Sequence, residues 1–257
     1  MVNISEIELK KTWDIVFNLA FNFLHEKNTA EEATQDIFLK VYNSISTFRN
    51  ESSLSTWIYR IAYNYLIDQK RLCFKEEISF ELFEQDVNNY KPYENELNLS
   101  DKEMEIYIEQ VKVGCTKAML QCLDPVDRFV YILGKLFAFE CKHGAKICDM
   151  TEAAYRQRLS RASKRVTNFM KFNCGQINKN ATCHCKRRIQ IAMDRHRINP
   201  DMLLHHTESK KIKDYLATMN HLDSIAEVFR DNPFIEKSQC YTKEIDQIVV
   251  KLVQCAI

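Results

Sequence analysis

The sequence predicts an all-α protein: two small helical domains joined by an acidic linker, then a helical C-terminal extension with a cysteine-rich knot. Only four Gly and four Pro occur in 257 residues, which leaves few positions for sharp turns. Apolar residues recur at helical spacing along most of the chain, and this length suits one or two compact units with appendages. We place the domains at 1–72 and 100–172, the linker at 73–99 and the extension at 173–257.

Three amphipathic helices are predicted for the first domain. The first covers about residues 6–25, the second runs from a capping box at Thr29 and Glu32 to about residue 46, and the third begins near Ser55. The apolar residues expected to face the core are Trp13, Phe17, Ala20, Phe21, Leu24, Ala33, Ile37, Val41, Ile45, Ile58, Ile61, Ala62, Tyr65 and Leu66.

Aromatic and basic side chains alternate along the third helix and the loop before it. Unpaired bases stack on aromatic rings while cations hold their phosphates, so this composition suits melted DNA. The small polar groups of the loop could hydrogen-bond a flipped base. An ordinary amphipathic helix with its rings in the core explains the pattern equally well. The candidate residues are Arg49, Asn50, Ser53, Trp57, Tyr59, Arg60, Tyr63, Asn64, Lys70 and Arg71.

The net charge of +1 hides two oppositely charged segments. Residues 73–110 hold eleven acidic residues against three Lys, a balance of −8, and residues 155–197 hold twelve Lys or Arg against one acid, a balance of +11. Such blocks indicate interaction surfaces, because crowded like charges repel unless a partner neutralises them. Residues 73–99 also lack a sustained period and contain Pro92, so we predict a flexible linker there.

The second domain is predicted to contain a helix-turn-helix. Helices resume near Ser100, and Asp124-Pro125 marks a new start. Within residues 139–166 a short helix reaches Cys148, a turn follows at Asp149-Met150, and Thr151 caps a second helix. Two departures from the usual motif are Gly144 inside the first helix, which costs about 1 kcal/mol, and Asp149 where Gly is common.

The second helix of this motif suits the major groove of duplex DNA, where polar and basic side chains meet base edges and phosphates. Tyr155, Leu159 and Ala162 are expected to face the core. A merely solvated charged face is the alternative. The candidate DNA contacts are Thr151, Glu152, Arg156, Gln157, Ser160, Arg161 and Lys164.

A cysteine-rich knot follows, with Cys174, Cys183 and Cys185 on a tight segment. Three soft thiolates could bind Zn²⁺, completed by His184, His196 or Cys148. Neighbouring cations could instead activate the thiols as a redox sensor, or the cysteines could be reduced and buried. These three interpretations stay open, and we expect no cofactor to be required apart from a candidate zinc ion.

The residues after the cysteine-rich knot show no clustering of catalytic side chains. Two further amphipathic helices are predicted at 212–229 and 245–252, packing on the other domains or on a partner. No apolar run is long enough for a bilayer and the N-terminus lacks a signal-peptide core, so we expect a cytoplasmic protein without membrane contact. Metalloenzyme motifs are absent from the sequence, which argues against an enzyme.

The run AEEATQDIFLKVYNSISTFRN, followed by STWIYRIAYNYLIDQKR, resembles region 2 of the extracytoplasmic-function sigma factors of bacterial RNA polymerase, over residues 15–71. The resemblance implies that one helix binds the clamp of the largest subunit of core polymerase and that the loop and third helix recognise and melt the minus-ten promoter element. The implied polymerase contacts are Glu32, Gln35, Asp36 and Phe38.

Residues 124–171 are similar to region 4 of the same family, which reads the minus-35 element. The acidic linker would then thread the active-site and RNA-exit channels of polymerase, and a subset of the family has a similar CG…CxC extension. The implied function is promoter recognition in transcription initiation, with an anti-sigma factor or the chain's own extension as regulator. The alternative is a stand-alone helix-turn-helix regulator with a metal- or redox-sensing C-terminal segment.

Overall fold

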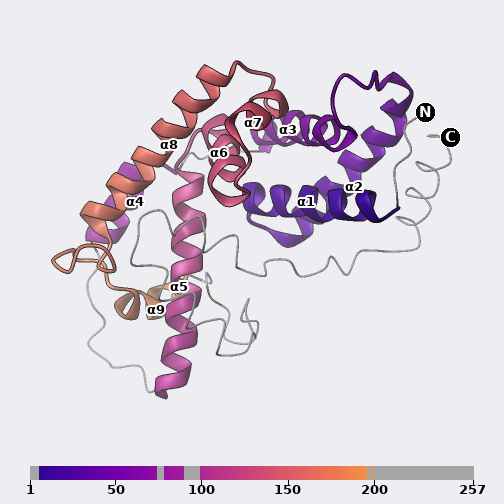
Figure 1. Cartoon of the computed structure of the whole chain (residues 1–257). Helices are drawn as coiled ribbons and strands as arrows, with labels where there is room; N and C mark the ends of the chain where they lie inside the picture. The colour runs from indigo at the N-terminus through magenta and orange to yellow at the C-terminus, as the bar shows by residue number, and fades with distance from the viewer. Residues whose placement is uncertain (1–5, 74–77, 90–98, 196–197, 199–257) are drawn as a thin grey trace. The chain divides into compact units, whose positions relative to one another are not determined.

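The computed structural model describes residues 6–73, 78–89, 99–195 and 198, and most of these residues are α-helical (Figure 1). Within this part of the chain the one extended pairing is an isolated bridge between Cys174 and Cys183. The predicted all-α class is confirmed. The described residues form two compact units, one of 6–73 with 125–160 and the other of 78–89 with 99–124, 161–195 and 198.

Three helices begin the first unit: α1 (Glu6–Leu24), α2 (Lys27–Ser44) and α3 (Leu54–Cys73). Their apolar faces meet in one core, where the rings of Trp13 and Phe38 lie 4.5 Å apart between centroids. Most of the residues predicted for this core are buried, with Ile45, Ile61 and Leu24 at its half-exposed edge. The three-helix arrangement expected from the apolar spacing is therefore present.

The start of α2 corrects one prediction. The side chain of Glu26 accepts hydrogen bonds from the backbone N–H groups of Asn28 and Thr29, so Glu26, not Thr29, caps the helix. The helix begins earlier because this carboxylate satisfies N–H groups that have no partner within the helix. At α3, Ser53 Oγ accepts from the N–H of Thr56, close to the predicted start.

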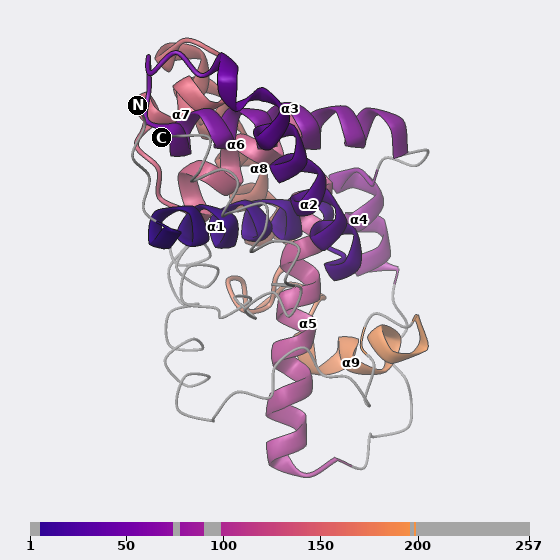
Figure 2. The same ribbon diagram turned by 90° about the vertical axis from the view of Figure 1, so that its right-hand side faces the viewer.

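The first unit also contains α6 (Pro125–Tyr131), a π-helical turn (Ile132–Leu136), α7 (Cys141–Ile147) and the first turns of α8 (Glu152–Asn173). Helices α6 and α7 lie beside α3 in both views (Figures 1 and 2). The buried guanidinium of Arg128 donates to the backbone carbonyl of Phe23 at 3.3 Å, which fixes α6 against the end of α1. Pro125 stands at the first helical position, as predicted.

The predicted helix-turn-helix is formed by α7, a turn and α8. Asp149 has a left-handed backbone, with φ of 51°, and the Met150 N–H donates to the carbonyl of Ala145 at 3.0 Å. Thr151 caps α8 by accepting from the N–H of Ala154. Gly144 is required by contact: a Cβ atom there would lie 2.3 Å from Cζ of the buried Tyr155 ring.

The second unit contains α4 (Phe80–Asn88), α5 (Asp101–Gln121), the rest of α8 and α9 (Cys185–Asp194). Ser100 and Glu103 form a capping box at the start of α5. Helix α9 packs beside α5 (Figures 1 and 2). The core between these two helices is made of Val111, Ile189, Ala192 and Ile198.

Helix α4 corrects the prediction that the whole of residues 73–99 is a flexible linker. Ser79 caps this helix, and Phe80, Phe83 and Val87 form a buried face with helical spacing. The acidic composition concealed this short apolar period. The unit boundaries also differ from the domain boundaries predicted at 1–72 and 100–172, because residues 125–160 pack with α1–α3 while α5 packs with α9.

The predicted helices at 212–229 and 245–252 lie outside the described residues. No helix in the described ranges has both the length and the apolar character needed to cross a bilayer.

Candidate nucleic-acid interface

One face of α2 presents acidic and polar side chains to solvent. Glu32, Gln35 and Asp36, which were predicted to contact a protein partner, are exposed. Phe38 is not available for such a contact, since it is 0% exposed and packs on Trp13. The neighbouring Leu39 is 50% exposed and lies on the same helical face, at the i, i+3, i+4, i+7 spacing. Leu39, which the sequence analysis did not single out, is therefore the exposed apolar side chain beside these polar residues.

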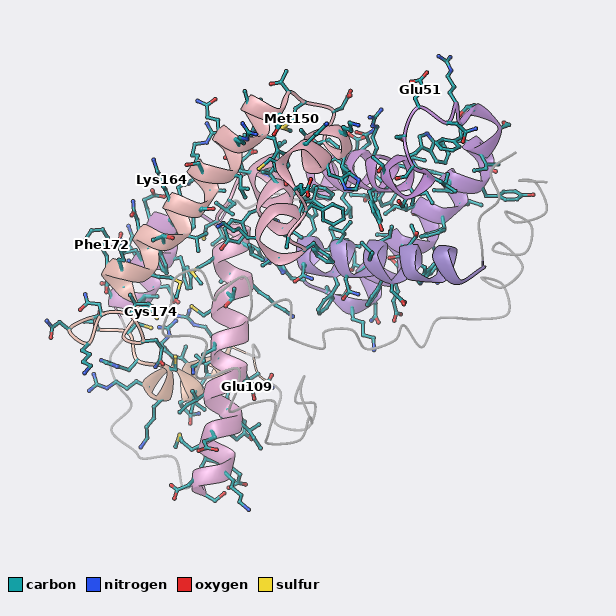
Figure 3. The ribbon with its side chains drawn as sticks, viewed as in Figure 1. Glu51, Glu109, Met150, Lys164, Phe172 and Cys174 are labelled. Atoms are coloured by element: carbon teal, nitrogen blue, oxygen red, sulfur yellow. The ribbon has the colours of Figure 1, made fainter. Side chains whose placement is uncertain are left out.

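The loop between α2 and α3 is polar and open to solvent. Arg49, Asn50 and Ser53 are exposed, and Asn50 has a left-handed φ of 58°. Glu51 lies at the tip of this loop (Figure 3). At its end the half-buried ring of Trp57 packs against Phe48 with 5.3 Å between centroids. The loop therefore places small polar groups next to a partly open aromatic ring.

Two of the predicted base-stacking rings are already occupied by neighbours. Tyr59 is 4% exposed and meets Phe139 edge-on at 5.8 Å, while Tyr63 meets Phe129 of α6 at 5.0 Å. Burial raises the pKa of Tyr59 to about 12. Tyr59 is thus unavailable for stacking in this arrangement, because it fills the space between α3 and the segment before α7.

Polar contacts join the same face of α3 to α7. Thr56 Oγ1 and His143 Nε2 lie 2.7 Å apart. The Arg60 guanidinium donates to the carbonyl oxygen of Lys146 from Nε at 3.2 Å and from Nη2 at 3.0 Å. Carbonyls in the last turn of a helix have no partner within it and carry partial negative charge, so a guanidinium is a fitting cap. Helix α7 therefore covers part of the predicted minus-ten surface.

The remaining members of that set differ in their placement. Asn64 is exposed on α3, whereas the side chains of Lys70 and Arg71 lie outside the described residues. The predicted residues of α3 thus share one helix but not one open surface.

Helix α8 presents the second predicted DNA surface. Thr151, Arg156, Gln157, Ser160, Arg161 and Lys164 are exposed, and Glu152 is half-buried in an ion pair with Arg156 one turn on. Figure 3 shows Lys164 projecting from the helix. Tyr155 and Ala162 are buried, as predicted, and Leu159 is half-buried. Arg158 is a structural residue: it donates to the buried carboxylate of Asp127 at 2.6 Å, and a buried charge requires such a partner.

The cysteine-rich segment folds around the bridge between Cys174 and Cys183. The Gly175 N–H donates to the Cys183 carbonyl at 2.8 Å, and a Cβ atom at Gly175 would lie 2.6 Å from Nδ1 of His184. Cys185, at the start of α9, packs on the core that includes Val111. Cys115 lies one turn after Val111, on the same face of α5.

Burial affects the ionisation of two of these thiols, Cys185 and Cys115. Burial, followed by the charge of Cys174, raises the pKa of Cys185 to about 12. Burial, and then the charges of Cys174 and Cys183, raises the pKa of Cys115 well above its usual range. Among the described side chains, no three His, Cys, Asp or Glu are already placed to hold a metal ion. Cys148 belongs to the first unit, and His196 lies outside the described residues.

Comparison with known proteins identifies one part of the chain directly. The family model for sigma-70 region 2 matches residues 13–72, which include α2, the loop and most of α1 and α3.

Longer similarities extend beyond this segment. A probable RNA polymerase sigma factor of Haemophilus influenzae is 21% identical over 173 residues, covering 64% of this chain and 89% of that protein. The ECF RNA polymerase sigma factor SigX of Bacillus subtilis is 27% identical over 161 residues, covering 60% and 77%. A shorter match, to the RNA polymerase sigma factor YlaC of the same organism, is 38% identical over 56 residues, covering 22% and 32%.

Among solved structures, the sigma factor RpoE of Bartonella quintana, in complex with the anti-sigma factor NepR, shows a distant likeness. Its TM-score is 0.43 at 20% identity, over 64% of this chain and 94% of that one.

Proposed function

We propose that separate surfaces of the chain bind core polymerase, the minus-ten element and the minus-35 element, since the chain belongs to the extracytoplasmic-function sigma factors of bacterial RNA polymerase. These non-catalytic factors direct the core enzyme to promoters. The match of residues 13–72 to region 2 carries the assignment, and the long alignments to sigma factors support it. A stand-alone helix-turn-helix regulator is not favoured, because it would leave the region 2 match without a role. The protein would act in the cytoplasm, with polymerase.

Polymerase docking is assigned to the exposed face of α2. Glu32, Gln35 and Asp36 would meet basic groups of the polymerase clamp, and Leu39 replaces Phe38 as the apolar anchor. Charges at the rim of an interface steer association, while a central apolar side chain holds it. The acidic segment 73–99 would enter the channels of polymerase that otherwise hold nucleic acid.

Recognition and melting of the minus-ten element are assigned to the loop and α3. Arg49, Asn50, Ser53 and Asn64 are exposed to bases and phosphates, and Trp57 offers a partly open ring. Arg60, Tyr59 and Tyr63 contact residues of the α6–α7 segment, so their use requires this segment to leave α3. Lys70 and Arg71 complete the proposed set.

Reading of the minus-35 element is assigned to α8. Its exposed side chains Arg156, Gln157 and Ser160 recur at the spacing of one helical face, which a major groove accommodates. Thr151, Glu152, Arg161 and Lys164 flank this face and would position the helix on the backbone.

Run-off transcription with purified core polymerase tests the proposal. We expect start sites preceded by a shared promoter motif. Trp57→Ala combined with Asn64→Ala should reduce open-complex formation, since base–aromatic stacking contributes about 1–3 kcal/mol per base, and should leave polymerase binding intact. Ser46→Ala, at an exposed position nearby, is the control. Failure of the chain to associate with core polymerase would reject the assignment.

We also propose a metal site in the cysteine-rich segment, where Cys174, Cys183 and Cys185 would bind Zn²⁺ with Cys115 as a fourth thiol. All four lie in the second unit, with Cys115 on α5 and Cys185 at the start of α9. Thiolates are the soft ligands of structural zinc sites, and binding would draw the four together. Zinc analysis of the reduced chain should give one ion per molecule, weakened by Cys115→Ser but not by Cys122→Ser. A metal-free reduced chain in the presence of zinc would refute it.

The regulatory partner is proposed at the level of class. An anti-sigma factor would bind the surfaces that polymerase and DNA use, and the chain's own extension could take the same role.

A further inference from the structure

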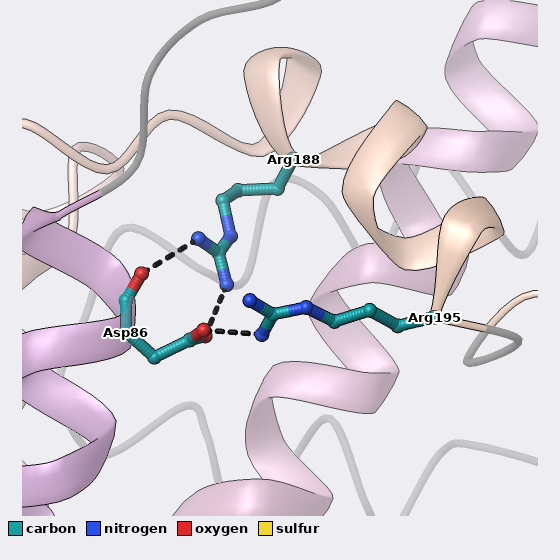
Figure 4. Close-up of polar contacts among 3 residues, drawn as sticks. All are labelled: Asp86, Arg188 and Arg195. Atoms are coloured by element: carbon teal, nitrogen blue, oxygen red, sulfur yellow. Dashed lines mark hydrogen bonds and ion pairs between the residues drawn. The ribbon is translucent and has the colours of Figure 1, made fainter.

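Helix α4, in the acidic segment, is held by the C-terminal extension within the second unit. Asp86 lies at the centre of this contact (Figure 4). Arg188 Nη2 donates to Asp86 Oδ2 at 2.6 Å, Arg188 Nη1 donates to the Asp86 backbone carbonyl at 3.1 Å, and Arg195 pairs with Oδ1. One carboxylate from the acidic segment thus receives two guanidinium groups from α9 and its end.

These charges are withdrawn from solvent to different degrees. The side chain of Arg188 is 8% exposed, that of Asp86 20% and that of Arg195 47%. Burial raises the pKa of Asp86, but hydrogen bonds from Arg195 and Arg188 lower it more, so the carboxylate is charged at neutral pH. A buried guanidinium that lost its partner would be strongly unfavourable, so Arg188 makes the contact specific for the acidic helix.

Two further layers of contact extend from Asp86 along α4. In the middle of the helix, Asn173 Nδ2 donates to Glu84 Oε1 at 3.1 Å, and at its C-terminal end Thr182 Oγ1 donates to Asn88 Oδ1 at 2.6 Å. On the buried face of the helix, Phe83 stacks on Phe169 with centroids 4.8 Å apart. The end of α8, the cysteine-rich segment and the α9 region therefore all contact this one short helix.

We propose that Asp86, Arg188 and Arg195 form a latch by which the extension restrains the acidic segment. This inference rests on the proposed function, because it names a contact that competes with polymerase. A segment folded as α4, with its apolar face against α8 and its carboxylate between two arginines, cannot at the same time occupy a polymerase channel. Full binding to core polymerase therefore requires the latch to open.

The binding deficit follows from the fraction of molecules that are open. Apparent affinity falls in proportion to the competent fraction, so a chain that is open about one-tenth of the time binds about tenfold more weakly than an unlatched one. Asp86→Asn keeps the size of the side chain and removes its charge. We expect it to tighten binding of the full chain to core polymerase by on the order of tenfold.

The experiment compares full-length wild type, Asp86→Asn and Glu105→Gln by hydrogen exchange and by equilibrium binding to core polymerase. Glu105 is an exposed acid on α5 away from the latch, so its loss controls for net charge. In Asp86→Asn the amides of residues 80–88 should exchange faster and binding should tighten, with both unchanged in the control. A thermal melt checks that the variant remains folded.

The other possible outcomes distinguish a failure of the latch from a failure of the proposed function. If residues 80–88 stay protected in Asp86→Asn, the ion pairs do not hold α4, and the latch is rejected. If these amides are released but binding is unchanged, α4 is not restrained from polymerase, and the latch is again rejected. If neither the wild type nor Asp86→Asn binds polymerase while α4 is released, the proposed function itself has failed.

Discussion

At the scale of single residues, Gly144 shows why a helix can contain glycine despite the low helix propensity of this residue. Helix propensity alone makes Gly144 a defect of about 1 kcal/mol in the short α7. The structure gives the reason, since the Tyr155 ring occupies the space where any side chain would begin. Sequence reasoning could flag this position but not explain it, because the partner comes from another helix. Asp149 was predictable, since Asp tolerates the left-handed backbone that the turn requires.

Replacement of Gly144 by Ala should therefore reverse the usual sign of a Gly-to-Ala change. We expect Gly144→Ala to destabilise the chain by about 1–3 kcal/mol through overpacking. Gly114→Ala in α5, where a Cβ atom would meet nothing within 4 Å, should stabilise it by about 0.5–1 kcal/mol. Urea unfolding of both variants measures the difference, and equal signs would contradict the assigned packing.

Cys148 gives a second prediction at this scale. Burial raises the pKa of its thiol to about 12, although Arg158 opposes the shift. Because the thiolate is the reactive form, alkylation of Cys148 at pH 8 should be about a thousandfold slower in the folded chain than in urea. The unfolded thiol ionises first, so Cys148 contributes stability below about pH 9 that is lost as the pH rises. Mass spectrometry of iodoacetamide labelling checks this, and equal rates would contradict it.

At the scale of helices, positions with a strong local signal were predicted well. The starts of α3, α6 and α8 follow from Ser53, Pro125 and Thr151, which act on their own backbone. Helix α4 was missed, because three apolar residues in an acidic segment give a weak period. The burial of Phe38 in place of Leu39 could not be decided from sequence, since both border the apolar face of α2.

For helix α8 we predict that Lys164 contacts a phosphate and that Gln157 contacts a base. Lys164→Gln should weaken binding to all duplex sequences and reduce the slope of log affinity against log salt by about 1, because one phosphate contact is lost. Gln157→Ala should change base preference and leave that slope unchanged. Titrations at several salt concentrations test this, and a salt-independent loss in Lys164→Gln would place Lys164 away from the backbone.

At the scale of the whole molecule, the packing of α6 and α7 on α3 was not predictable. Both interpretations of the rings of α3, as core or as DNA contacts, fitted the sequence, and the choice depends on which helix covers them. In this structure the core interpretation holds for Tyr59, while Trp57 and Asn64 stay on the open side. Amphipathic spacing specifies that a face is buried, but the neighbour that buries it is set by tertiary contacts.

Because α7 packs on α3, weakening the contact between these two helices should favour DNA binding by α3. His143→Ala removes the contact with Thr56, and one hydrogen bond contributes about 0.5–1.5 kcal/mol. We therefore expect a few-fold tighter binding of single-stranded minus-ten DNA to the full chain, measured by fluorescence anisotropy. Lys142→Ala, at an exposed neighbour on α7, is the control. Unchanged affinity in His143→Ala would mean that α7 does not compete with the strand.

The described residues of the first unit come from two stretches of chain, with α4 and α5 between them. During translation, α1, α2 and α3 leave the ribosome long before their covering helices, at about 5–20 residues per second. For that interval the nascent chain would present Tyr59 and Tyr63 without α6 and the segment before α7. A newly made molecule would thus pass through an uncovered state before it ever met a promoter.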